Sequence, residues 1–187
     1  MSAGETSTQR DDQRATANPI DRSRAFANLV YEAFYAAGLG GSIVALFFLI
    51  VDVANGSPLL TPTIMGSVLF LGVPAASVTA PDLGMVAYYS IVHFVTFGLL
   101  GGCVSFIVHE VELHAKHPAN LLLLIFGVFE LAFFAGAATL LPGVLERLGV
   151  ARVAVANLLA AGGIALFMVS THRPDLWRQW KDSLGLA

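Results

Sequence analysis

The sequence has few charged residues and a single cysteine. Only 12% of its 187 residues are Asp, Glu, Lys or Arg, whereas 56% are hydrophobic. A soluble domain cannot bury so large an apolar fraction, so this class of protein is excluded. Cys103 has no second cysteine with which to form an intrachain disulfide or a CxxC motif. The net charge of −3 lacks the basic excess that phosphate binding needs, which excludes nucleic acid as a partner.

Motifs that carry known catalytic chemistry are also missing. The sequence has no GxSxG nucleophile turn and no phosphate-binding glycine loop. Its hydrophilic loops are too short to enclose a substrate pocket of about 300 Å³ outside a membrane. The sequence therefore does not indicate an enzyme, and any chemistry would have to take place between membrane helices.

Four long apolar runs dominate the chain instead. About 20 apolar residues in a helix cross the roughly 30 Å of hydrocarbon in a bilayer. The sequence therefore predicts an all-α integral membrane protein, a bundle of four transmembrane helices. The predicted spans are 34–53, 84–108, 119–141 and 150–170.

The two ends of the chain differ from these spans. Residues 1–17 are polar and lack a possible core, which predicts a disordered tail, and residues 18–187 form a single membrane domain. Asn18 and Pro19 are typical of the start of a helix that runs into the first span. After Pro174, apolar residues share one helical stripe, which predicts an amphipathic helix in the cytoplasmic interface. The stripe consists of Leu176, Trp177, Trp180 and Leu184.

The basic residues predict the orientation in the membrane. Eight of the ten Lys and Arg residues lie before the first span, between the second and third spans, or after the fourth, and only Arg147 and Arg152 lie on the other side. Because cytoplasmic loops carry the excess of positive charge, both termini are expected in the cytoplasm, with the protein in the inner (plasma) membrane.

The outer loop between the first two spans contains a short apolar segment from Thr61 to Gly72. Pro62 is typical of a first helical turn, and Gly72 of a helix end. The segment is too short to cross a bilayer. It therefore predicts an interfacial or re-entrant helix on the outer face.

Small residues recur at the spacing that lets membrane helices approach closely. These small residues are Ala37, Gly41 and Ala45 in the first span, Gly98 and Gly102 in the second, and Gly162 and Gly163 in the fourth.

The second and third spans are joined by a very short loop, so they are expected to pack side by side.

Two ionisable residues lie deep within predicted spans, His93 in the second and Glu130 in the third. Such residues are rare in membranes and mark functional sites or buried pairs. At 1.5 Å per residue both lie about 14–17 Å from the outer end of their spans, so the sequence predicts that they pair. The pair could relay protons or only hold the bundle together. Possible supporting residues are Ser42, Thr96 and Asn157.

A second group of ionisable residues lies at the inner end of the second span. Glu110, His114 and His117 share one helical face at i, i+4 and i+7, a spacing that suits a divalent metal. Pro118 disfavours helical geometry at His117, and a solvated helix end explains the same residues. A haem held by His109 or His114 with His172 is a further hypothesis, because these residues lie at one depth on different spans.

These observations favour an accessory or structural subunit of a larger membrane complex. The alternatives are a small proton-linked transporter or channel that uses His93 and Glu130, or a protein that binds haem or metal. No cofactor is predicted outright, although haem or a divalent metal fits the histidines. The expected partners are the lipid bilayer and other membrane subunits or further copies of the chain.

Overall fold

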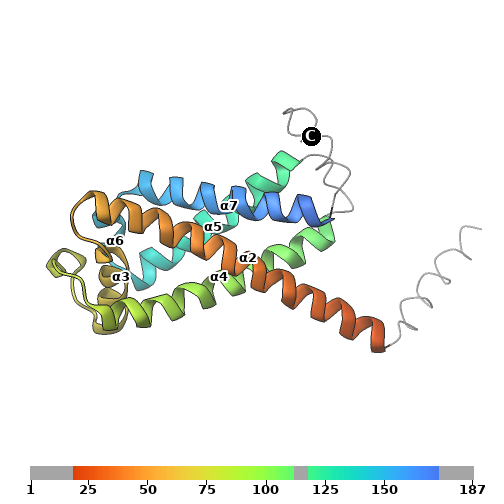
Figure 1. Ribbon diagram of the computed structural model, residues 1–187, viewed down its shortest axis with the longest axis horizontal. Coiled ribbons are helices and arrows are strands. Elements are labelled where there is room, and N and C mark those ends of the chain that lie inside the picture. Colours follow the sequence, from red (N-terminus) through yellow and green to blue (C-terminus); the bar gives the residue numbers. More distant parts are fainter. Residues whose placement is uncertain (1–18, 112–117, 173–187) are drawn as a thin grey trace, which may run out of the picture.

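The computed structural model describes residues 19–111 and 118–172, all helical or in short connections (Figure 1). The described elements contain four helices long and apolar enough to cross a membrane, as predicted. In chain order the elements are α2 (Pro19–Ala54), α3 (Leu60–Leu71), the 3₁₀ turn η1 (Ala75–Ser77), α4 (Leu83–Val111), α5 (Pro118–Leu140), α6 (Val144–Leu148) and α7 (Val150–His172).

Large apolar side chains cover much of the outer surface of these helices. Phe34 of α2 is 75% exposed, Leu99 of α4 is 68% exposed and Leu131 of α5 is 73% exposed. Such surfaces are unfavourable in water but match the hydrocarbon of a bilayer. Together with the lengths of the four helices, they indicate a multi-pass membrane protein in contact with lipid.

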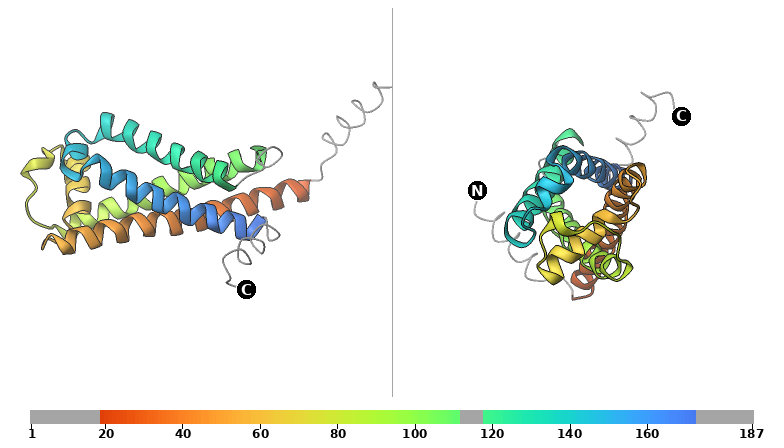
Figure 2. Two further views of the ribbon diagram at one scale, coloured as in Figure 1. Left: turned by 90° about the horizontal axis from the view of Figure 1, so that it is seen from above. Right: turned by 90° about the vertical axis from the view of Figure 1, so that its left-hand side faces the viewer.

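The four long helices run along the long axis of the molecule, and α2 packs between α4 and α7 (Figures 1 and 2). Glycines allow this close approach. A Cβ on Gly41 of α2 would lie 3.0 Å from the ring of Phe94 on α4. A Cβ on Gly163 of α7 would lie 2.5 Å from the Cδ1 of Ile43 on α2. The small residues at these two positions therefore have the packing role that their spacing predicts.

The expected side-by-side packing of the second and third spans is not found. Helices α4 and α5 contact each other far less than α4 contacts α2 or α5 contacts α7. The sequence order α2, α4, α5, α7 is thus not the order of packing, because the glycine-lined faces of α2 hold both α4 and α7. Viewed end-on, α7 lies between α2 and α5 (Figure 2).

Helix α3 lies across one end of the bundle rather than along it (Figures 1 and 2). Its residues from Thr61 to Val68 are buried except Pro62, so α3 is more enclosed than a helix lying on the interface. Gly72 ends it in the left-handed conformation, with φ 64°, as its position in the sequence predicts.

The connection between α2 and α3 is a tight turn. Gly56 has φ +72°, which glycine adopts at no steric cost. Leu59 has φ 66°, a conformation that costs a residue with a Cβ roughly 1–2 kcal/mol. Leu59 lies between two anchored residues, because the Ser57 N–H donates to the Asp52 carbonyl at 2.9 Å and Thr61 donates to the Asp52 carboxylate.

The predicted disordered tail (1–17) and the predicted amphipathic C-terminal helix lie outside the described residues.

Candidate intramembrane binding site

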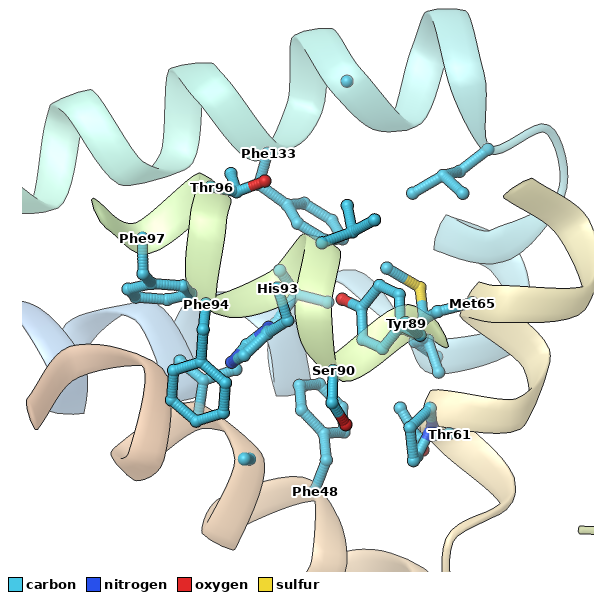
Figure 3. Close-up of a pocket in the computed structure, with 18 of the residues that line it drawn as sticks. Phe48, Thr61, Met65, Tyr89, Ser90, His93, Phe94, Thr96, Phe97 and Phe133 are labelled. Carbon is cyan, nitrogen blue, oxygen red and sulfur yellow. The ribbon is translucent and has the colours of Figure 1, made fainter. Parts of the chain in front are cut away.

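The bundle contains a cavity of about 410 Å³. Every helix from α2 to α7 contributes to its wall, and most of the lining side chains are apolar. Figure 3 shows Phe133 of α5 on one side of the cavity, Phe48 on another and Met65 of α3 at one end. Leu140 and Thr96 also line the cavity and are exposed, so the cavity reaches the outer surface of the bundle.

Among the described residues, no charged side chain lines the cavity, so the polarity of its wall comes from neutral groups. Their positions follow the α-helical repeat along α4, where Tyr89, His93 and Thr96 project towards the same space. The remaining polar side chains in the wall are Thr61 of α3, Ser90 of α4 and Asn157 of α7. The Ser90 hydroxyl donates a hydrogen bond of 2.7 Å to the Val86 carbonyl oxygen, one turn earlier on the same helix.

His93 is the central polar residue of this wall. It is 9% exposed and its Nε2 lies 2.9 Å from the carbonyl oxygen of Gly41 on α2. A carbonyl only accepts, so Nε2 carries the proton and donates it. The rings of Phe94 and Phe97 lie against His93, with centroid distances of 5.3 and 4.8 Å. His93 therefore links α4 to α2 inside an aromatic environment.

Tyr89 is a lining residue that sequence reasoning missed. Its position near the outer end of the second span is typical of an interfacial aromatic. The structure instead places its ring beside His93, with centroids 5.7 Å apart, and its hydroxyl points into the cavity (Figure 3). The four-residue spacing from His93 was the available signal, because residues at i and i+4 share one helical face.

Glu130 has a different partner from the one predicted. Its Oε1 accepts a hydrogen bond of 3.4 Å from the Nδ2 of Asn157, which is 6% exposed, so the contact joins α5 to α7. Within the described part of the chain, His93 and Glu130 do not bond to each other. The expected direct pair does not form because it assumed that α4 and α5 pack closely along their length, whereas these two helices make few contacts.

The three possible supporting residues have different positions. Asn157 supports Glu130, as described above. Thr96 lines the cavity, and Ser42 of α2 is exposed. Neither hydroxyl forms a hydrogen bond with a described residue, so neither joins His93 or Glu130 in a polar layer.

Double-mutant cycles should separate the two interactions. For Glu130→Leu and Asn157→Leu we expect a coupling of about 0.6 kcal/mol, the average for hydrogen bonds between membrane helices. For His93→Leu and Glu130→Leu we expect the effects to add within about 0.5 kcal/mol, because the two residues share no partner. Free energies of unfolding in detergent measure both cycles. A larger coupling in the second cycle than in the first would contradict the arrangement described.

Asp52, which the sequence places at the outer end of the first span, fastens α3 to the bundle. Its two carboxylate oxygens accept hydrogen bonds of 2.7 Å from the backbone N–H and the hydroxyl of Thr61. Both residues are buried. The carboxylate thus satisfies a backbone donor in the first turn of α3 that has no partner within the helix. Because Thr61 also lines the cavity, this contact fixes the end of the site next to α3.

The residues of the metal and haem hypotheses are not placed. His114 and His117 lie outside the described residues, as do the side chains of His109, Glu110 and His172. Among the side chains that the structure describes, no group of three His, Cys, Asp or Glu residues could hold a metal ion.

Comparisons of the chain with protein-family models, with curated proteins and with solved structures found no match.

Proposed function

We propose that this protein binds a lipophilic molecule from the bilayer in the cavity between its membrane helices. The observation that carries the proposal is the cavity itself. Its volume of about 410 Å³ lies within the range of roughly 300–1,000 Å³ typical of small-molecule sites. Its wall has the composition of such sites, apolar and aromatic with a few polar groups.

The energetics of packing support an occupant. An apolar cavity in a protein interior costs roughly 24 cal/mol per Å³. An apolar space of this size left empty would therefore be costly, and a lipophilic molecule that enters it removes that cost. Since the cavity reaches the surface of the bundle, a molecule dissolved in the membrane can enter it from the side.

Filling the cavity with protein should displace its occupant. Gly136 of α5 lines the cavity, and a Cβ built on it meets nothing within 4 Å. We expect Gly136→Phe to place its ring in the cavity and to reduce the amount of co-purifying lipophilic molecule at least fivefold. Extraction of the detergent-purified protein with organic solvent, followed by quantitative mass spectrometry, measures this amount.

Gly127 provides the matched control on the same helix. A Cβ on Gly127 also meets nothing within 4 Å, but this glycine is exposed and does not line the cavity. Gly127→Phe should therefore retain the occupant at the wild-type level. Equal amounts in wild type, Gly136→Phe and Gly127→Phe, or no enriched molecule in any of them, would overturn the proposal.

The second candidate is the accessory subunit that the sequence favours. The same observation supports it, because a partner's transmembrane helix could lie where α4 and α5 make few contacts with each other. In that case stoichiometric protein partners, and no small molecule, would co-purify from gentle detergent, and Gly136→Phe would lose them.

Proton-linked transport has less support. It was based on a pair of His93 and Glu130, and these residues bond to Gly41 and Asn157 respectively. We retain the inner-membrane orientation with both termini in the cytoplasm, which rests on the distribution of Lys and Arg. In that orientation α3 lies on the outer side.

A further inference from the structure

Two hydrogen-bonding atoms in the cavity wall lack a partner among the described residues. They are the hydroxyl of Tyr89 and the Nδ1 of His93. Both side chains line the cavity from the same face of α4, one helical turn apart, and their rings lie beside each other (Figure 3). His93 is buried and Tyr89 is half-buried, and polar side-chain atoms inside a protein usually have a hydrogen-bond partner, so this pair requires one that the described residues do not supply.

The chemistry of the missing partner follows from the atoms already used. His93 donates through Nε2 to the Gly41 carbonyl, so in the neutral ring Nδ1 has a free lone pair and accepts. The Tyr89 hydroxyl can donate one hydrogen bond. One hydroxyl group on a ligand meets both needs, because it donates to Nδ1 of His93 and accepts from the hydroxyl of Tyr89.

The depth of these residues strengthens the requirement. Tyr89 lies six residues and His93 ten residues after Leu83, the first residue of α4. At 1.5 Å per residue they lie about 9 and 15 Å below the outer end of that helix. The hydrocarbon at this depth offers no hydrogen-bonding groups, so polar side chains must be satisfied from within the protein or by a ligand.

The rest of the wall excludes a charged ligand. No Asp, Glu, Lys or Arg in the described part of the chain lines the cavity, so a carboxylate, phosphate or ammonium group would lie there without a counter-charge from these residues. Around His93 the wall is aromatic, with Phe97 packed edge-to-face on Phe129 of α5 at 5.3 Å. These surfaces suit a ring or a hydrocarbon chain next to the hydroxyl.

We propose that the ligand is an uncharged, hydroxyl-bearing lipid, such as a long-chain phenol or alcohol. Its hydroxyl donates to Nδ1 of His93 and accepts from Tyr89, and its hydrocarbon lies along Phe97, Phe129 and Phe133. This assignment rests on the proposed function, since it names the class of molecule that the same cavity binds. It gives His93 a second role besides its bond to Gly41, that of selecting the head group.

A matched pair of probes tests the assignment on the wild-type protein. The probes are a long-chain 4-alkylphenol and its methyl ether, in which a methyl group replaces the hydroxyl hydrogen. The ether can still accept from Tyr89 but cannot donate to His93. In lipid nanodiscs, equilibrium binding of radiolabelled probes should show the phenol bound about tenfold more tightly than the ether. This comparison needs no variant, so it does not depend on how a substitution affects folding.

Two variants then separate the contributions of the two side chains. His93→Phe should weaken binding of the phenol about tenfold and leave binding of the ether nearly unchanged, so that the preference for the phenol is lost. Tyr89→Phe should weaken binding of both probes about threefold to tenfold and keep the preference for the phenol, because both probes accept a hydrogen bond from the Tyr89 hydroxyl. If His93 has only a structural role, His93→Phe will weaken binding of both probes equally, and this result would overturn its assignment as the acceptor.

The outcomes also distinguish this inference from the proposed function. Equal binding of phenol and ether to the wild-type protein, combined with loss of both in Gly136→Phe, overturns the hydroxyl-bearing ligand and supports the cavity as a binding site. Failure of both probes to bind, with no lipophilic molecule retained on purification, overturns both proposals.

Discussion

Asp52→Ala is expected to lower the free energy of unfolding by about 3 kcal/mol and to loosen α3 from the end of the bundle. The Asp52 carboxylate accepts two hydrogen bonds of 2.7 Å, both from Thr61. Alanine would leave the backbone N–H and the hydroxyl of Thr61 without an acceptor, and each unpaired buried group costs about 1–3 kcal/mol. Denaturant unfolding in detergent, followed by circular dichroism, measures the loss.

Two variants serve as controls for this prediction. Asparagine has the same shape as aspartate, and its amide can accept from the Thr61 N–H and donate to the Thr61 hydroxyl, so Asp52→Asn should lose only about 1 kcal/mol. Asp82 also binds backbone donors, those of Gly84 and Met85 at 2.7 and 3.1 Å, but it is exposed. Asp82→Ala should therefore cost about 1 kcal/mol, as for an ordinary helix cap. If all three variants lose the same amount, burial of the Asp52 contact has no special effect.

The ends of the helices could be predicted from the sequence because local chemistry determines them. Pro19 begins α2 and Gly72 follows the last residue of α3, each at the position expected from its restricted or permissive backbone. The four long apolar helices followed from length and composition alone. These signals depend only on neighbouring residues, so a single sequence contains them.

The pairing of the helices could not be predicted in the same way. A short loop between consecutive spans favours side-by-side packing, which predicted contact between α4 and α5. The competing signal was the shape of α2, whose Gly40 and Gly41 accommodate side chains from α7 and α4. Spacing identified these glycines as packing residues, but it could not say which partner each one faces.

The candidate site was found only in part for this reason. His93 was identified because an ionisable residue within an apolar run is conspicuous in a sequence. Its partner, however, is a backbone carbonyl, that of Gly41, and backbone groups leave no mark in a sequence. Tyr89 could not be assigned to the site, because the sequence gives its depth but not the direction in which its side chain points. The cavity itself depends on the helix pairing and could not be predicted without it.

Gly66→Ala should be among the most damaging single-methyl substitutions in the chain, with a loss of about 3 kcal/mol in the free energy of unfolding. A Cβ at this position of α3 would lie 2.6 Å from the carbonyl oxygen of Met85, in the first turn of α4. Overpacking costs about 1–3 kcal/mol where neighbouring side chains can adjust, and more where they cannot. Here the obstacle is backbone, and the Asp82 N–H that donates to Thr63 Oγ1 at 3.1 Å holds α4 against α3.

Two other glycines make this a graded test of the contact between α3 and α4. A Cβ on Gly40 would lie 2.7 Å from the Cδ1 of Ile164, the end of a side chain that can rotate, so Gly40→Ala should lose about 1 kcal/mol. Gly38 is exposed with nothing within 4 Å, so Gly38→Ala should be neutral or gain up to about 1 kcal/mol from helix propensity. The expected order of stability is Gly38→Ala, then Gly40→Ala, then Gly66→Ala, measured by the same unfolding experiment. A Gly66→Ala protein as stable as Gly38→Ala would mean that α3 does not lie against the first turn of α4, and the cavity would then lack the wall that α3 provides.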